Sequence, residues 1–187
     1  SRYFTKASNF LFMIFTKTEF DGVYIIELEK IEDDRGFFAR YYDIKKFKEM
    51  GLNPKIAQCS ISFNKKKGTI RGMHYQIQPF QEEKLVYCNK GKIFDVIIDL
   101  RPKSKTFKKW LGITLDSHNK IIYIPKGFAH GFQTLQNNTL VNYQISEFLM
   151  PEYSRGIKWN DSSFQIKWPL KPTIISKKDQ SYQQFRY

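Results

Sequence analysis

The chain has 187 residues, and its 31 Lys and Arg residues against 18 Asp and Glu residues give a formal net charge of +13. One domain of this length, 41% hydrophobic and 17% aromatic, can build a core, which argues against intrinsic disorder. The longest apolar run, Phe10 to Phe15, has six residues, far fewer than the roughly 20 that cross a bilayer. We therefore expect a cytoplasmic protein that does not bind membranes.

The first twelve residues differ from the segment that follows them. Met13 begins a segment that is typical of a first strand, so we predict an extension over 1–12 and a single domain over 13–187. The two cysteines, Cys59 and Cys88, have no CxxC spacing and are too few for a disulfide scaffold. We expect both thiols to be reduced.

Short segments rich in β-branched and aromatic residues recur along the chain, separated by turn residues such as Asn89–Lys92 and Asp116–Asn119. One segment, Asp43 to Met50, is typical of a helix that stops at Gly51. This pattern predicts an all-β jelly roll with one or two short helices, and it does not fit alternating α/β units. The clearest predicted strands are Val23–Ile26, Lys84–Tyr87, Ile93–Ile98, Trp110–Leu115 and Ile121–Ile124.

The basic charge alone is compatible with nucleic acid, an anionic membrane surface or a phosphorylated small molecule. The lysines are scattered through turns and form no helical stripe, which indicates a solvated surface for most of them. The chain has neither a P-loop nor a GxGxxG motif. A phosphorylated ligand would therefore be bound by individual Arg and Lys side chains.

Each of the three histidines can be assessed separately. His118 lies in a polar turn and is expected at the surface, whereas His130, between glycines and aromatic residues, is either structural or a substrate contact. His74 follows Arg71 in a strand-like stretch, where alternation places the two side chains on opposite faces unless Gly72 forms a bulge. The histidines have no HxH spacing or nearby carboxylate, so we predict no metal site.

Several short motifs occur in a fixed order along the chain. They are Asp33–Phe38, Ile70–Gln76, Lys84–Val86, Gly91–Arg101, Tyr123–Phe132, Arg155–Asp161, Ile166–Pro169 and Ser176–Asp179. Together they resemble the dTDP-4-dehydrorhamnose 3,5-epimerase family over roughly residues 14–180. The resemblance implies a cupin-type double-stranded β-helix, a homodimer, a nucleotide-sugar substrate, and catalysis without a cofactor or metal.

The resemblance also implies a role for individual residues. His74 is the expected base, Asp179 its carboxylate partner, Lys84 the cation at the enolate oxygen and Tyr143 the proton donor. The residues expected to bind substrate are Arg35, Gln58, Arg71, His130 and Lys178. Without the resemblance, Tyr143 reads as a core tyrosine, Lys84 as a solvated lysine and Asp179 as an exposed carboxylate.

Three positions depart from the family pattern. Arg40 stands where a glutamate is usual, Ser60 replaces the asparagine of a QxN pattern, and Phe148 replaces a tyrosine. These departures leave open the nucleotide, the sugar and whether one or both of C3 and C5 are inverted. The alternatives are a single-centre epimerase, a 3,4-ketoisomerase of another nucleotide 4-keto sugar, and a non-catalytic module that binds anions.

Overall fold

A computed structural model describes residues 13–117 and 120–186. The predicted extension over 1–12 and the predicted surface position of His118 lie outside the described residues. The strands are β1 (Met13–Lys17), β2 (Tyr24–Leu28), β3 (Ile31–Asp33), β4 (Gly36–Phe38), β5 (Gln58–Asn64), β6 (Thr69–Gln76), β7 (Lys84–Lys90), β8 (Lys92–Asp99), β9 (Trp110–Asp116), β10 (Lys120–Ile124), β11 (Phe128–Thr134), β12 (Thr139–Ile145), β13 (Ser154–Gly156) and β14 (Ile174–Ile175). The helices are α1 (Ile44–Glu49), the short 3-10 turn η1 (Pro151–Tyr153) and α2 (Lys177–Ser181).

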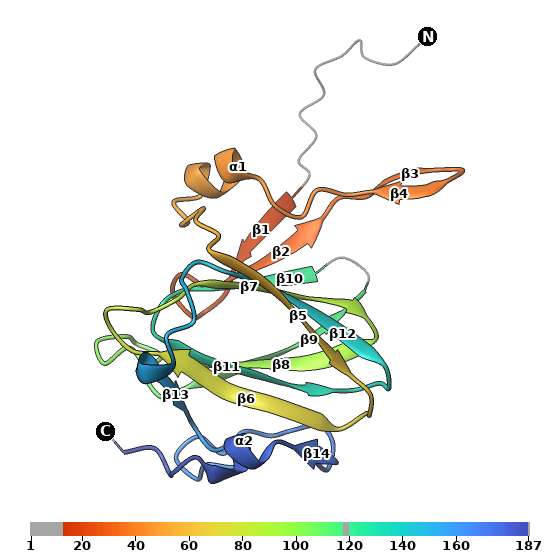
Figure 1. Cartoon of the computed structure of the whole chain (residues 1–187). Helices are drawn as coiled ribbons and strands as arrows, with labels where there is room; N and C mark the ends of the chain where they lie inside the picture. Colours follow the sequence, from red (N-terminus) through yellow and green to blue (C-terminus); the bar gives the residue numbers. More distant parts are fainter. Residues whose placement is uncertain (1–12, 118–119, 187) are drawn as a thin grey trace.

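Two sheets face each other and form the jelly roll that the strand pattern predicts (Figure 1). The first sheet has the order β1-β2-β10-β7-β12-β5, and the second has the order β13-β6-β11-β8-β9, with β14 pairing parallel to β6. Each segment predicted as a strand lies within or overlaps an observed one, and the predicted helix corresponds to α1. The all-β fold class is therefore confirmed.

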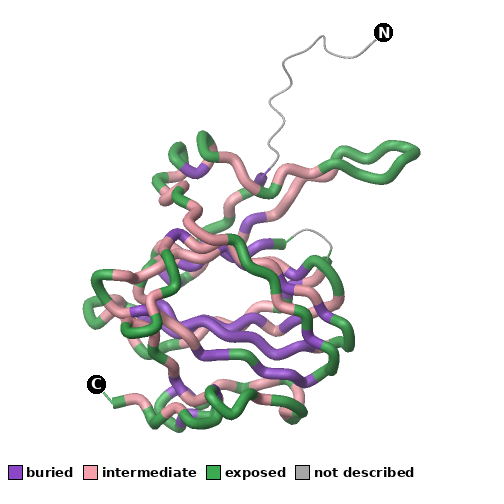
Figure 2. Tube along the Cα trace, viewed as in Figure 1, coloured by how far each residue is buried: buried purple, intermediate pink, exposed green. Residues whose placement is uncertain are grey.

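The main core lies between the two sheets, where every second residue of the central strands points inward. Val86 and Val141 of the first sheet pack with Ile97 and Phe132 of the second, and all four are almost fully buried. Figure 2 shows the buried stretches concentrated along the central strands. Two smaller clusters lie outside the sheets, one beneath α1 around Phe47 and one where the C-terminal segment covers β6, β8 and β11.

The helix α1 begins and ends where its sequence predicts. The Asp43 carboxylate accepts hydrogen bonds from the main-chain N–H groups of Lys45 and Lys46, which satisfies two of the free donors at the helix start. Gly51 then takes a φ of +70°, which ends the helix. The helix buries Phe47 against the first sheet and leaves its lysines in solvent.

The hairpin of β3 and β4 projects away from the body of the protein (Figure 1). Its residues are exposed, including the large apolar side chains of Ile31, Phe37 and Phe38. In the described part of the chain, no helix is long and apolar enough to span a membrane. The cytoplasmic location stays a prediction.

Candidate active site

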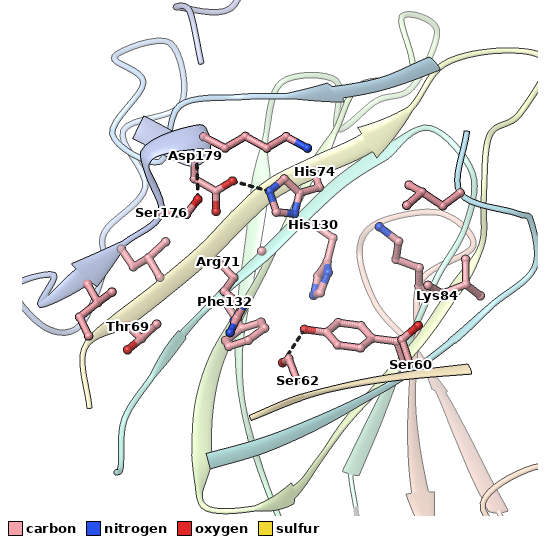
Figure 3. Close-up of a pocket in the computed structure, with 17 residues that line it drawn as sticks. Ser60, Ser62, Thr69, Arg71, His74, Lys84, His130, Phe132, Ser176 and Asp179 are labelled. Atoms are coloured by element: carbon pink, nitrogen blue, oxygen red, sulfur yellow. Dashed lines mark hydrogen bonds and ion pairs between the residues drawn. The ribbon is translucent and has the colours of Figure 1, made fainter. Parts of the chain in front are cut away.

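A cavity of about 680 Å³ opens between the two sheets. This volume lies within the range of pockets that hold small ligands. Side chains from both sheets and from the C-terminal segment line it (Figure 3). The predicted site residues that line it are Arg71, His74, Lys84, His130, Tyr143, Lys178 and Asp179.

A bulge in β6 brings Arg71 and His74 to the same face. His130 of β11 pairs with His74, whereas Phe132 pairs with Arg71, so three steps along β6 match two along β11. The extra residue lies at Gly72, where the sequence allows a bulge without deciding it. Arg71 and His74 therefore both line the cavity, while Met73 points into the core beneath the C-terminal segment.

His74 forms a dyad with Asp179. Its Nε2 lies 2.7 Å from the Asp179 Oδ1, and the carboxylate side chain is only 6% exposed. The other carboxylate oxygen accepts the main-chain N–H of Gly72, and the Ser176 hydroxyl caps the N–H of Asp179. Burial alone would raise the pKa of the Asp179 carboxyl, but the hydrogen bonds from His74 and Gly72 hold it below its ordinary value. Asp179 is therefore an ionised partner for the imidazole.

The ring of His74 has one nitrogen committed to Asp179 and one available for chemistry. An ionised carboxylate accepts a hydrogen bond from the Nε2–H group, which fixes the neutral tautomer with Nδ1 unprotonated. Figure 3 shows the second ring nitrogen on the cavity side of the imidazole. This is the arrangement that a general base needs, with its orienting group behind it.

Tyr143 lies on β12, in the sheet opposite His74. Its hydroxyl shares a hydrogen bond of 3.2 Å with the Ser62 hydroxyl on β5. Burial raises the pKa of the Tyr143 phenol well above its usual range, and the hydrogen bond from Ser62 and the charge of Arg71 offset only part of this effect. The phenol therefore keeps its proton at neutral pH and can serve as an acid.

Lys84 enters the same cavity from β7, next to the β12 strand that carries Tyr143. Its ammonium lies 2.7 Å from the carboxylate of Glu82, and both side chains are 11% exposed. The reading of Lys84 as a solvated lysine is therefore wrong. A cation largely shielded from water interacts more strongly with developing negative charge than one at the surface.

His130 is buried beneath the cavity and bonds Asp95. Its Nε2 lies 2.7 Å from the Asp95 Oδ2, and the two side chains are 5% and 0% exposed. Both interpretations made from the sequence fit this position, because His130 has a structural partner and also lines the cavity. Lys178 reaches the cavity rim from α2, beside Asp179.

Two predicted binding residues lie outside this cavity. Arg35 is at the turn of the β3–β4 hairpin, where its 89% exposed side chain pairs with Asp33. Gln58 accepts the main-chain N–H of Leu149 at 2.8 Å, so it supports a residue that lines the cavity without lining it itself. Within a single chain, the structure does not bring these two residues to the others.

Sequence reasoning missed several residues that support the site. These are Ser62, which bonds Tyr143, Asp95, which bonds His130, and Glu82, which pairs with Lys84. A signal for Ser62 was present in the alternation of Ser60, Ser62 and Asn64 as polar residues, but no strand was predicted there, and the structure shows that the three lie on β5. Nothing local in the sequence links Asp95 to His130, because 35 positions separate them.

The described residues contain no group of three or more His, Cys, Asp and Glu side chains arranged to hold a metal ion. Both of the described histidines have a carboxylate partner on Nε2. A histidine with an ionised partner and a protonated phenol are groups that can transfer protons, and Lys84, Arg71 and Lys178 bring positive charge to the same cavity.

Comparison with known proteins matches nearly the whole chain. A family model described as dTDP-4-dehydrorhamnose 3,5-epimerase matches residues 17–187. A dTDP-4-dehydrorhamnose 3,5-epimerase of Shigella flexneri is 40% identical over 171 residues, which cover 90% of this chain and 94% of that protein. The crystal structure of a dTDP-4-dehydrorhamnose 3,5-epimerase from Elizabethkingia anophelis NUHP1 superposes with a TM-score of 0.89 at 39% identity, covering 93% of this chain and 97% of the other.

A third similar structure was solved with a sugar nucleotide bound. It is the dTDP-6-deoxy-D-glucose-3,5-epimerase from Legionella pneumophila Philadelphia 1 in complex with dTDP-4-keto-L-rhamnose. It superposes with a TM-score of 0.87 at 35% identity and covers 92% of each chain. Both the fold and the sequence thus agree over almost the full length of this chain.

Proposed function

This chain belongs to the dTDP-4-dehydrorhamnose 3,5-epimerase family, as its motifs predicted, and from that premise we propose that it inverts C3 and C5 of dTDP-4-dehydro-6-deoxy-D-glucose. The product is dTDP-4-dehydro-L-rhamnose. One observation carries the proposal: a base with its carboxylate partner and a protonated phenol stand on opposite sheets across one cavity. Inversion requires a proton to leave one face of the sugar carbon and return on the other.

The first step is removal of a carbon-bound proton next to the C4 ketone. His74 takes this proton on its cavity-facing nitrogen. The electron pair of the broken C–H bond forms a double bond to C4 of the sugar, and the ketone becomes an enolate. The imidazolium that results is stabilised by the ionised Asp179 at 2.7 Å. Because the Gly72 N–H holds this carboxylate and the Ser176 hydroxyl holds the main-chain N–H of Asp179, the imidazole does not have to reorient during the reaction.

The enolate carries its negative charge on the C4 oxygen. Lys84 is the cation that enters the cavity near Tyr143, and its ammonium binds this oxygen in the proposed mechanism. A preorganised charge in a shielded site lowers such a barrier by several kcal/mol. Glu82 holds the lysine side chain in place at 2.7 Å.

The second step returns a proton from the opposite face. Tyr143 gives its phenolic proton to the carbon, and the enolate collapses to the ketone. The phenolate then regains a proton from solvent, and the His74 imidazolium releases the proton that it took from the sugar to solvent. The same sequence at the second carbon completes the double inversion. Arg71 and Lys178 bind the diphosphate, since guanidinium and ammonium groups are the cations that pair with phosphate oxygens.

We propose in addition that the protein is a homodimer. The β3–β4 hairpin extends away from its own chain and exposes Phe37 and Phe38, 59% and 56% accessible, with the Lys30 ammonium 4.3 Å from the centre of the Phe37 ring. Contiguous exposed apolar side chains of this size favour a protein interface. Arg35 at the hairpin turn then contributes to substrate binding in the cavity of the second chain.

The proposed reaction is tested by incubating the protein with dTDP-4-dehydro-6-deoxy-D-glucose in deuterated water. We expect deuterium at both C3 and C5 of the recovered sugar, together with the inverted product, by mass spectrometry and NMR. Deuterium at one carbon would instead identify a single-centre epimerase. Movement of the carbonyl to C3 would identify a ketoisomerase, and the absence of any label would overturn the assignment of this substrate.

A further inference from the structure

Asn64 is a buried polar residue that links two parts of the site without lining the cavity. It ends strand β5 and is 2% exposed. Its Oδ1 accepts a hydrogen bond of 2.7 Å from the Nε of Arg71. Its Nδ2 lies 3.4 Å from the hydroxyl oxygen of Ser62 and 3.3 Å from the main-chain oxygens of Ser62 and Thr139. Asn64 therefore contacts both the strand that carries Arg71 and the hydroxyl that bonds Tyr143.

The orientation of the Asn64 amide follows from its neighbours. A guanidinium only donates hydrogen bonds, so the amide oxygen must face Arg71 and the NH₂ group must face Ser62. When the Asn64 NH₂ occupies a lone pair of the Ser62 oxygen, the Ser62 hydroxyl hydrogen is free to point toward the Tyr143 oxygen at 3.2 Å. This is the orientation that stabilises a phenolate.

We propose that Asn64 is a positioning residue that couples the anion-binding Arg71 to the proton donor Tyr143. The inference rests on the proposed function. After Tyr143 has given its proton to the substrate, the Ser62 hydroxyl donates to the phenolate, and Asn64 holds that hydroxyl in the donating orientation. Arg71 in turn holds Asn64, so the Arg71 guanidinium both binds the substrate and orients Tyr143 on the opposite sheet.

The coupling predicts an effect on only one of the two proton transfers. Removal of the substrate proton depends on His74 and Asp179, and among the described residues neither side chain hydrogen-bonds to Asn64. Return of the proton depends on Tyr143. Deuterium in recovered, uninverted substrate reports removal and return on the His74 face, whereas formation of the inverted sugar reports donation by Tyr143. The ratio of exchange to inversion therefore separates the two steps.

The test compares this ratio in deuterated water for the wild-type protein, Asn64→Ala and Asn64→Asp. We expect the exchange-to-inversion ratio to rise about tenfold in both variants, on the scale of a lost hydrogen bond to a charged group. KM should rise only in Asn64→Ala, because an Asp retains the acceptor for Arg71. In a Tyr143→Phe background, Asn64→Ala should leave the remaining inversion unchanged.

The matched control is Asn137→Ala. Asn137 also links the β5–β6 and β11–β12 turns, by accepting the N–H of Lys67 at 2.8 Å, but it lies outside the cavity. The exchange-to-inversion ratio of Asn137→Ala should equal that of the wild type.

Equal losses of exchange and inversion in folded Asn64 variants would overturn the inference and leave Asn64 a structural residue. If Asn64→Ala does not fold, Asn64→Asp carries the same test. A wild-type protein that shows no exchange would overturn the proposed function, and with it this inference.

Discussion

Asp179 is the residue on which the proposed chemistry of His74 depends most directly. Its carboxylate accepts from the imidazole and from the Gly72 N–H, and it is almost completely shielded from solvent. Asp179→Asn keeps the shape but removes the charge, so the imidazole loses its fixed tautomer and the stabilisation of its protonated form. We expect kcat to fall on the order of 10²- to 10⁴-fold.

The measurement for Asp179→Asn is steady-state turnover together with substrate exchange in deuterated water. Exchange and inversion should fall together, because both begin with proton removal by His74, and KM should change little. Lys177→Ala, a change at the exposed start of α2 outside the cavity, is the control and should retain activity. Turnover of Asp179→Asn near the wild-type rate would remove the dyad from the mechanism.

At the scale of the strands, the close pairing of β6 with β11 depends on Gly72. Its φ is +128°, and an added Cβ would lie 2.5 Å from the Gly131 Cα and 2.9 Å from the His130 carbonyl oxygen. Backbone atoms on a paired strand cannot move aside as a flexible side chain can. Gly72→Ala should therefore cost about 3 kcal/mol or more, from backbone strain and overpacking together.

Gly36→Ala provides the matched control for Gly72→Ala. Gly36 has a similar φ of +124°, but an added Cβ would meet nothing within 4 Å in its exposed hairpin. Both variants share the backbone strain of a positive φ, so the urea unfolding midpoint of Gly36→Ala should fall modestly. That of Gly72→Ala should fall much further, or the protein should be insoluble, because its Cβ also meets backbone atoms of β11. Equal midpoints for the two variants would show that contact with β11 does not constrain Gly72.

The same elements show how much of the site could be predicted from the sequence. Alternation and turn residues predicted the strands, because those signals are local. The sharing of one face by Arg71 and His74 depends on a bulge that strand pairing with β11 decides, so the sequence could only leave it open. The pairing of His74 with Asp179 spans 105 positions and was implied by resemblance alone.

At the scale of the whole molecule, the fold shows where the basic residues behind the net charge of +13 lie. The cavity gathers Arg71, Lys84 and Lys178 from three separate elements, so a small part of the basic surplus lies where we propose that the anionic substrate binds. The other lysines remain distributed over the surface, as their scatter through turns predicted. The charge therefore gives no reason to invoke nucleic acid as the ligand.

The proposed dimer predicts that two inactive variants regain activity when they are mixed. If Arg35 of one chain serves the cavity of the other, a mixture of His74→Ala and Arg35→Ala proteins contains complete sites. Each mixed dimer then joins an intact His74 in one chain to an intact Arg35 from the other. Random pairing of equal amounts makes half of the dimers mixed, each with one complete site, so activity should recover to about one quarter of the wild type.

The mixing experiment is measured at substrate concentrations well below KM, after the two variants have been unfolded and refolded together. The separate variants, treated alike, are the controls and should stay well below the mixture. Sedimentation should give twice the mass of one chain for the wild type and for Arg35→Ala. In the double variant Phe37→Ser and Phe38→Ser, the sedimenting mass should shift toward that of one chain, because the exposed hairpin rings are the proposed contact. A dimer without recovered activity would place Arg35 outside the site, and a wild-type monomer would overturn the assembly itself.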